Sequence, residues 1–408
     1  MKSTLRALLF FAALVASSMH SRDAHAYAWM IRHGFAECGG CHVDPMGGET
    51  LTGMGRVMGQ TLLASGYGEK TPSNVAMFLF GVQEPDAVRL GGSFRLMDIY
   101  DFKTTEPTLF PMQTDFYGAV SAGRFVLGAS IGISRASDRY EYTDKARLFG
   151  SVDDRGYVAV SRNHWLGYKF TDDLMVRLGR MNLPFGLRIP EHIMWVRHET
   201  DTDRESDQEH GLSVVYSSGR FRGELMGFIG NLQIPKQYLS PGYSGYLEYS
   251  LDTNLAVGVS SLVSYAKRLP FTTDETVTSA QRAVTRIVDG VTLRYAPWRE
   301  LVFLGEADLQ KLTGSGLGSV GMLQADLEPL QGLHLALTGE WLNRGTLHPE
   351  DITAGVTRVP VGPGRGDTRY GLWTTVNWFF FPHFDIRSDL VFRGGRDTVL
   401  QTQLHFYL

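Results

Sequence analysis

Both cysteines of this 408-residue chain fall within one short motif, Cys38-Gly39-Gly40-Cys41-His42. The spacing C-x-x-C-H is the signature of covalent c-type haem attachment, in which two thiols bond the haem and the next imidazole binds its iron. Zinc would need about two more ligands at short range, and a thioredoxin-type site would need a βαβ pattern around the cysteines. We therefore predict one covalent haem c, held by Cys38 and Cys41, with His42 as the proximal ligand of the iron.

The sequence leaves the distal ligand of the iron open. Met54 and Met58 recur at helical spacing between Thr50 and Ser65, so one helix face presents both thioethers. Each methionine could equally pack against the haem without binding iron. His33 is a third candidate, although a short helix that also carries His42 would struggle to place both imidazoles on opposite faces. A residue from the later part of the chain is a further alternative.

The first 26 residues have the pattern of a secretory signal. Lys2 and Arg6 precede an apolar run over 7–15, and small residues follow up to Ala24-His25-Ala26. This order is typical of a cleaved export signal, and the apolar run is too short for a membrane anchor. Export also suits the motif, because haem is normally attached to such motifs outside the cytoplasm. We predict a signal peptide over 1–26.

The mature chain divides into three parts. Residues 27–68 form the predicted monohaem segment, which is near the lower size limit for independent folding. Residues 69–88 read as a linker with Pro72 and Pro85. Residues 89–408 read as a chain of short strands in which apolar and polar residues alternate, for example Phe384, Ile386, Leu390 and Phe392. A period of two indicates half-buried strands, whereas a helical period would scatter these residues over every face.

The fold class is therefore all-β, an antiparallel barrel with a small helical N-terminal segment. About 320 residues suit about sixteen strands of roughly ten residues, a size that leaves an aqueous lumen. A soluble sandwich would show the same alternation, but charges in mid-strand, such as Glu306 and Asp308, and aromatic strand ends favour a membrane barrel. The predicted strand starts are Arg89, Met112, Arg124, Tyr157, Leu174, Gly211, Phe221, Tyr243, Leu255, Ala283, Leu301, Leu317, Gly332, Arg369, His383 and Thr398.

One stretch breaks the alternation and is rich in acids. Glu199, Asp201, Asp203 and Glu205 place a carboxylate at every second position. Such a loop could gather cations at a pore entrance, and Fe(II) would suit carboxylate and imidazole ligands. A solvated extracellular loop is the alternative. The net charge of the chain is −4, with no cluster of basic residues, so we expect no nucleic-acid partner.

The haem stretch resembles the fused outer-membrane cytochrome–porin family, whose best-known members are iron oxidases. The likeness rests on about 40 residues: Arg32, Cys38 to His42, Pro45, Leu51-Thr52, Gly55-Arg56 and Gly66-Tyr67. The chain departs from the iron oxidases at His33, where they tend to have Gln, and Pro45-Met46-Gly47-Gly48 is similar to a wider group of porin-linked monohaem proteins. Gly179-Arg180 and Pro184-Phe185-Gly186 resemble general porin families.

The resemblance implies electron transfer across the outer membrane of a Gram-negative bacterium. The expected partners are an extracellular donor such as Fe(II), a soluble periplasmic cytochrome and outer-membrane lipid. The direction of transfer follows from the resemblance alone. Two alternatives remain at this stage: a solute-conducting porin whose haem segment plugs or senses, and a haem enzyme such as a peroxidase.

Overall fold

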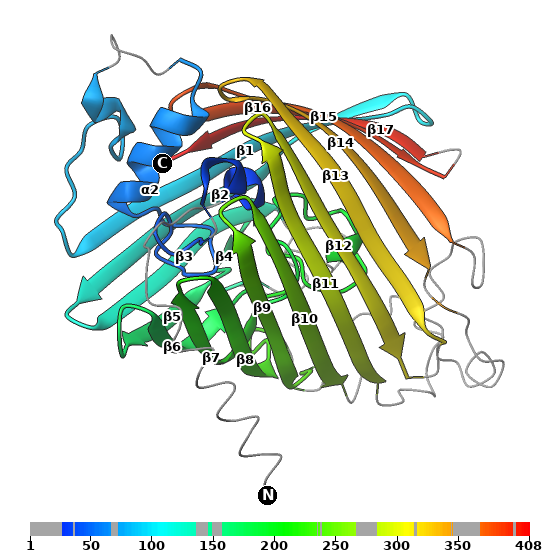
Figure 1. The fold of residues 1–408 in the computed structure, drawn as a ribbon, viewed down its shortest axis with the longest axis horizontal. Helices are drawn as coiled ribbons and strands as arrows, with labels where there is room; N and C mark the ends of the chain where they lie inside the picture. Colours follow the sequence, from blue (N-terminus) through cyan, green and yellow to red (C-terminus); the bar gives the residue numbers. More distant parts are fainter. Residues whose placement is uncertain are drawn as a thin grey trace, which may run out of the picture.

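The chain forms one closed antiparallel sheet that surrounds its own N-terminal segment (Figure 1). The computed structural model describes residues 27–35, 37–66, 72–135, 146–148, 157–234, 236, 239–266, 284–313, 316–343, 345, 368–394 and 397–408. The predicted signal peptide, 1–26, lies outside the described residues, as do 67–71 at the junction of the haem segment and the linker. Among the described residues, no helix is both long and apolar enough to cross a lipid bilayer.

Apart from β4 and β5, each strand pairs with its neighbours in the sequence, and the first strand, β1, pairs with the last, β17, which closes the ring. Two short strands, β4 and β5, both pair with β3 and share one place in the wall, so the seventeen strands occupy sixteen wall positions. The predicted number of about sixteen is therefore confirmed.

The strands are β1 Val88–Asp101, β2 Glu106–Ala122, β3 Phe125–Arg135, β4 Tyr157–Val160, β5 His164–Lys169, β6 Leu174–Met181, β7 Glu209–Ser218, β8 Phe221–Gly230, β9 Gly242–Asp252, β10 Leu255–Ala266, β11 Val284–Trp298, β12 Leu301–Leu312, β13 Gly318–Leu330, β14 Leu333–Asn343, β15 Arg369–Phe381, β16 Phe384–Arg393 and β17 Asp397–Tyr407. The helices are short: η1 Ala28–His33, α2 Gly53–Met58, η2 Gly59–Leu63, η3 Ser73–Ala76 and α4 Trp195–His198.

The predicted strand starts agree with these bounds to within two residues, except for the second strand. It begins at Glu106, not at Met112. The added part of β2 carries Pro107 and Pro111, which lack the N–H that a ladder uses and so argue against a strand in the sequence. Met112 sits at a bulge, because the register shifts opposite the step from Arg95 to Leu96, and this bulge accommodates the neighbouring proline.

The two faces of the wall differ in polarity. On β12, Glu306 and Asp308 point inward and are 2% exposed, whereas Leu309 points outward and is 53% exposed. On β13, Leu323 is likewise 57% exposed on the outer face. The charged phase of each strand thus faces the lumen and the apolar phase faces outward, an arrangement that suits lipid contact and is the reverse of a soluble sandwich.

The two ends of the barrel also differ. Two-residue turns join several strand pairs at one end, as at Gly219-Arg220 between β7 and β8, and the chain reaches its C-terminus at that same end. The opposite end carries the long connections, including residues 182–208 between β6 and β7. Short turns on one side and long loops on the other are typical of outer-membrane barrels, in which the turns face the periplasm.

The outward apolar band predicts a depth-dependent response to charge. Leu323→Arg places a cation in the middle of β13, where we expect a loss of about 2–4 kcal/mol of folding free energy in lipid. The same substitution at Leu330, at the turn end of that strand, should cost only about 0–1 kcal/mol. Unfolding titrations of vesicle-inserted protein, followed by heat-modifiable gel migration, measure both. Equal losses at the two positions would contradict the assignment of this face to lipid.

Candidate functional site

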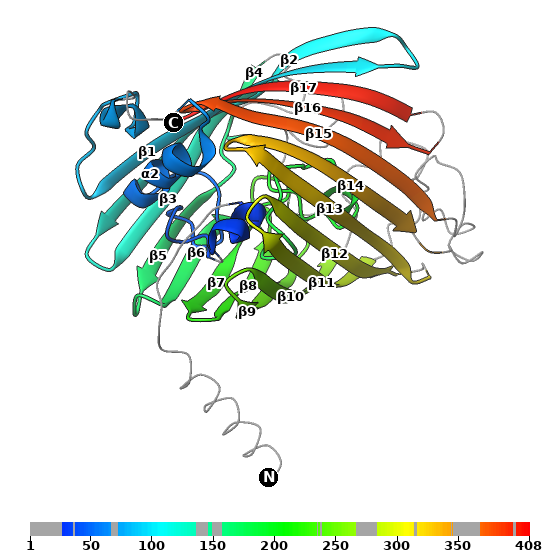
Figure 2. The same cartoon turned by 45° about the horizontal axis from the view of Figure 1, so that its top comes forward.

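The N-terminal segment lies inside the ring of strands, as both views show (Figures 1 and 2). Arg32 is one anchor: its Nη1 atom donates to Glu328 Oε2 at 3.0 Å, and its Nη2 atom pairs with the Asp326 carboxylate. Both acids face the lumen from β13, and all three side chains are buried. Arg32 belongs to the stretch that resembles the cytochrome–porin family, and the structure gives it this docking role.

Aromatic packing holds the same segment against the wall. The Trp29 ring lies 4.2 Å from the His334 ring and 6.3 Å from the Phe379 ring, between centroids. Ala28 and Ile31, also on η1, belong to a buried apolar cluster with Val302 and other inward residues of the wall. The apolar face of η1 thus replaces water at the lumen wall, which favours docking.

The following residues lie at the turn end of the barrel. The Thr52 hydroxyl accepts from Gly55 N at 3.1 Å and caps α2. The Ser65 amide donates to Phe379 O at 2.8 Å, and the Gln331 side-chain amide donates to Ala64 O at 3.0 Å. The end of this segment is therefore bound to the turn that follows β13 and to the last residues of β15, beside the C-terminus of the chain (Figure 2).

The C-x-x-C-H motif forms a single tight turn within the lumen. The amides of Cys41 and His42 both donate to Cys38 O, at 3.1 and 3.0 Å. A two-stranded bridge follows, in which His42 pairs with Leu51. Gly55 packs directly on the carbonyl of Cys41, so a larger residue there would clash. These contacts fix both cysteines and the histidine on one compact loop.

The residues present fit a covalently bound haem. Cys38 and Cys41 are 5% and 3% exposed and are not bonded to each other. Burial raises the pKa of the Cys41 thiol to about 12. Burial and the charge of Arg204 lower the pKa of His42 to about 4, so its imidazole is neutral, as an iron ligand must be. The His42 Nδ1 atom is buried. Among the residues that the structure describes, no group of three or more His, Cys, Asp or Glu side chains is placed to hold a metal ion.

Arginines from the wall and from loop 182–208 surround the motif. Arg222 Nη1, on β8, lies 2.7 Å from Cys38 Sγ. Arg177 Nη1, on β6, lies 2.8 Å from Asp44 Oδ1, and Arg204 donates to Gly47 O at 3.3 Å. Although burial opposes ionisation of Asp44, the charges of Arg177 and Arg188 hold its pKa below the ordinary value. Sequence reasoning missed these arginines, because each is one polar residue among many.

The three predicted distal ligands occupy different surroundings. The Met54 side chain is 55% exposed on α2, and Met58 at the end of α2 is partly exposed. His33 ends η1, with its Nε2 atom 3.9 Å from Glu328 Oε2. Burial lowers the pKa of His33 to about 4, so this imidazole is also neutral. Met54 is thus exposed at the turn end of the barrel, whereas Cys38 and Cys41 beside His42 are buried.

The acidic stretch folds into the lumen with the rest of loop 182–208. The Ser244 hydroxyl donates to Pro184 O at 2.9 Å, Gly186 N donates to Ser260 Oγ at 3.0 Å, and Arg197 pairs with Glu306. Asp203 is only 3% exposed, so the expectation of a solvated loop is wrong for this residue. The charged lumen holds the loop through hydrogen bonds and an ion pair. The sequence pattern alone did not reveal these contacts.

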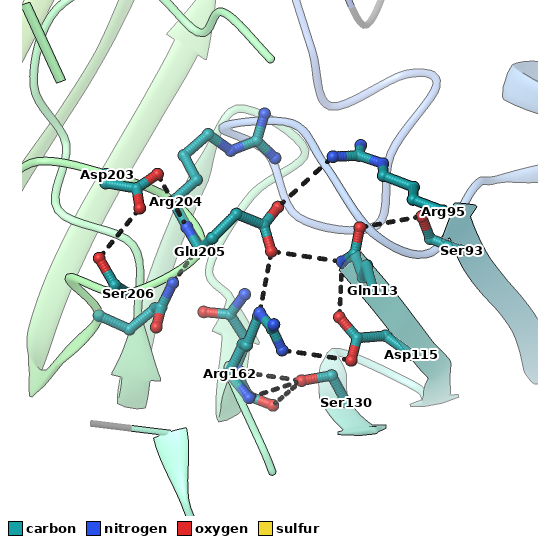
Figure 3. A network of polar contacts seen from close by, with 12 residues as sticks. Ser93, Arg95, Gln113, Asp115, Ser130, Arg162, Asp203, Arg204, Glu205 and Ser206 are labelled. Atoms are coloured by element: carbon teal, nitrogen blue, oxygen red, sulfur yellow. Dashed lines mark hydrogen bonds and ion pairs between the residues drawn. The ribbon is translucent and has the colours of Figure 1, made fainter. Parts of the chain in front are cut away.

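Basic residues of the barrel already neutralise several of these acids (Figure 3). Glu205 lies 2.9 Å from Arg162 Nε and 3.9 Å from Arg95 Nη1. Although burial opposes ionisation, these two guanidinium groups lower the pKa of Glu205 to about 2. Asp201 pairs with Arg286, and Glu199 lies 3.5 Å from His198 Nδ1. Burial and the neighbouring Asp207 carboxylate raise the pKa of Asp203 to about 7.

A bulge in the wall supplies one of these partners. Gly132 pairs with Val160 and Ala129 pairs with His164, so a step of three residues on β3 faces a step of four between β4 and β5. This one extra residue changes which side chains of the strand point into the lumen, as a β-bulge does. It turns Arg162 toward Glu205, and it lets the Asn163 amide reach Glu49 of the N-terminal segment. No signal in the sequence marks this bulge.

A cavity of about 190 Å³ adjoins this network. Its lining combines apolar groups of β2 and β4, including Pro111 and Val160, with Arg162, His192 and Glu205. The cavity lies between the wall and loop 182–208. Elsewhere in the lumen, inward polar residues of the wall such as Ser213 and Thr338 are 0% exposed.

Comparison with known proteins finds relatives in structure only. No protein-family model and no curated protein sequence matches this chain. The barrel is similar to OmpT of Vibrio cholerae in its trimer form, with a TM-score of 0.56 and 12% identity over 79% of this chain and 99% of that chain. It is similar to Salmonella typhi OmpF, solved in complex with daunomycin, with a TM-score of 0.56 and 10% identity over 79% of this chain and 97% of that chain. An anion-selective porin from Comamonas acidovorans gives a TM-score of 0.51 and 12% identity over 79% of this chain and 99% of that chain. The fold is therefore that of a porin-like outer-membrane barrel.

Proposed function

We propose that the chain is an outer-membrane electron-transfer protein with one haem c, held by Cys38, Cys41 and His42 inside the barrel. A bound haem supplies a one-electron redox centre whose potential depends on its ligands and surroundings. The net reaction oxidises one extracellular Fe(II) to Fe(III) and reduces one periplasmic cytochrome by one electron. The choice of Fe(II) and the inward direction rest on the resemblance of the haem segment.

The observation that carries this proposal is the place of the motif within the barrel. Cys38 contacts Arg222 on β8, and Asp44 contacts Arg177 on β6, so wall residues enclose the turn that would bear the haem. An outer membrane has an apolar layer of roughly 25–30 Å that blocks charged donors. A redox group enclosed by the wall divides this layer into two shorter steps of electron transfer.

The packing of the lumen supports transfer of electrons over passage of solutes. The N-terminal segment and loop 182–208 both enter the ring, and inward polar residues of the wall, such as Ser213 and Thr338, are buried. Arg32 on the first and Arg197 on the second each form a buried ion pair with the wall. Buried ion pairs of this kind are costly to break, so these insertions are held firmly.

A solute-conducting porin is the second candidate, and the comparisons favour it. The structural relatives are outer-membrane porins, and one of them is described as anion-selective. Arg162 and Glu205 both line the cavity beside loop 182–208, and charged groups of this kind select ions when they line a pore. In this reading, the N-terminal segment restricts the pore.

Removal of the Arg32 anchor should release the N-terminal segment while leaving the wall intact. Arg32→Ala leaves Asp326 and Glu328 buried without their cation, and we expect docking to weaken by about 3–5 kcal/mol. Limited proteolysis of the folded protein should then cut within residues 27–66, while heat-modifiable migration shows that the barrel persists. Arg220→Ala, in the exposed turn between β7 and β8, is the control. Unchanged protease resistance in Arg32→Ala would contradict this docking mode.

Reconstitution in liposomes separates the two candidate functions. Wild-type protein should pass electrons from an impermeant external Fe(II) chelate to a cytochrome trapped inside, followed by its absorbance. The double variant Cys38→Ala/Cys41→Ala should insert normally but lack covalent haem and electron transfer. His42→Ala should keep covalent haem with altered axial ligation and transfer electrons more slowly.

Conductance of the same samples decides for or against the second candidate. Solute-selective conductance that is equal in the wild type and the cysteine variant, without reduction of the trapped cytochrome, would establish the porin reading and overturn electron transfer. Absence of peroxidase staining on denatured wild-type protein would overturn haem attachment itself. A low-spin, six-coordinate resting spectrum would argue against a peroxidase.

A further inference from the structure

Arg188 is a buried cation in loop 182–208. The residue is 9% exposed, and its guanidinium makes no hydrogen bond or ion pair with any residue that the structure describes. The Nε atom is fully enclosed. An unpaired buried charge is strongly disfavoured, so such a group ordinarily has an anion beside it.

The carboxylates near Arg188 are already engaged by other arginines. Arg177 lies 2.8 Å from Asp44 and 2.6 Å from Glu224. Glu248 is shared by two more arginines, Arg222 at 3.1 Å and Arg294. Asp44 and Glu224, the two carboxylates whose charges act on Arg188, are thus both paired with Arg177, and Arg204 adds a further positive charge nearby.

Packing places the loop that carries Arg188 against the haem segment. Leu187 and Ile189, on either side of Arg188, belong to one buried apolar cluster with Trp29 and Ile31, and Val43, next to His42, packs against the cluster that holds Leu183 and Phe185 of the same loop. The electrostatic effect of Arg188 on Asp44 agrees with this placement. Burial and the neighbouring Arg204 lower the pKa of Arg188 to about 10, which still leaves it protonated at neutral pH. Arg188 also lines a cavity of about 30 Å³ that reaches Tyr27 and Trp29. A haem attached through Cys38 and Cys41 would belong to the segment against which loop 182–208 packs.

We propose that Arg188 binds a propionate carboxylate of the haem and thereby positions the haem in the lumen. This inference rests on the proposed function. A haem carries two propionates, and a guanidinium binds a carboxylate through two parallel N–H donors. Arg188 is a positioning residue here, because it acts on the haem edge and not on the iron. A positive charge near the haem also favours the state with one more electron, so Arg188 raises the reduction potential.

Charge removal at Arg188 tests this role on the full-length holoprotein. Arg188→Gln should retain covalent haem at the wild-type ratio, because Cys38 and Cys41 are untouched. The equilibrium constant for haem reduction should fall by a factor of about three to ten, the upper figure being about 59 mV for a one-electron couple. Arg188→Lys should recover most of the shift, since it keeps the charge. Arg220→Gln, outside the lumen, should change nothing.

The readouts are spectroelectrochemical titration, haem content by pyridine haemochrome, and the propionate bending band in resonance Raman spectra. A shifted potential together with a shifted propionate band in Arg188→Gln would support the proposal. An unchanged potential in a haem-loaded variant would overturn it and leave the proposed function standing. A wild-type protein without haem would instead overturn the proposed function.

A free anion is the other source of the negative charge, and a chloride titration distinguishes it. If Arg188 holds chloride, the wild-type potential should change with chloride concentration at constant ionic strength, and Arg188→Gln should lose that dependence. Such a result would overturn the propionate assignment. A potential that is independent of chloride in both proteins, with the Gln shift present, would support it.

Discussion

Closure of the sheet between β1 and β17 is the constraint on which the rest of the structure depends. In lipid every backbone N–H and C=O must be satisfied within the protein, and a ring of paired strands does this without leaving an edge. The nine residue pairs from Ser93–Tyr407 to Asp101–Val399 complete that ring. Once the ring exists, the outer phase of each strand must be apolar, and the polar phase is confined to a lumen of limited width.

Confinement of charge explains what fills the lumen. Inward acids such as Glu306 and Asp326 are costly if buried alone, so they need cations close by. The wall does not supply all of these cations. Arg197 reaches Glu306 from the loop that follows β6, and Arg32 reaches Asp326 from the N-terminal segment. The two inserted segments are therefore ionic partners of the wall as well as fillers of its space.

Much of the barrel could be predicted from the sequence, because a period of two in hydrophobicity follows directly from strand geometry. The strand that begins at Leu301, for example, could be predicted from this period alone. The sequence could not show which face of the sheet lines the lumen, because an alternating pattern fits either orientation until the surroundings of each face are known. The extension of β2 to Glu106 was hidden by its prolines, and the phase change before His164 depends on one extra residue in the register. The cysteine motif was evident from spacing alone, whereas Arg188 and Arg222 are recognisable only by what lies next to them in space.

The direction of synthesis gives the first-to-last pairing a further consequence. Residues 27–66 leave the ribosome before any strand that surrounds them, and their enclosure is complete only when β17, the last strand, reaches β1. Arg32 and Trp29 must first wait for β13, β14 and β15, which carry their acids and their aromatic neighbours. The N-terminal segment thus depends on the final eleven-residue strand of the chain, and a truncation at the C-terminus would disturb residues more than three hundred positions away.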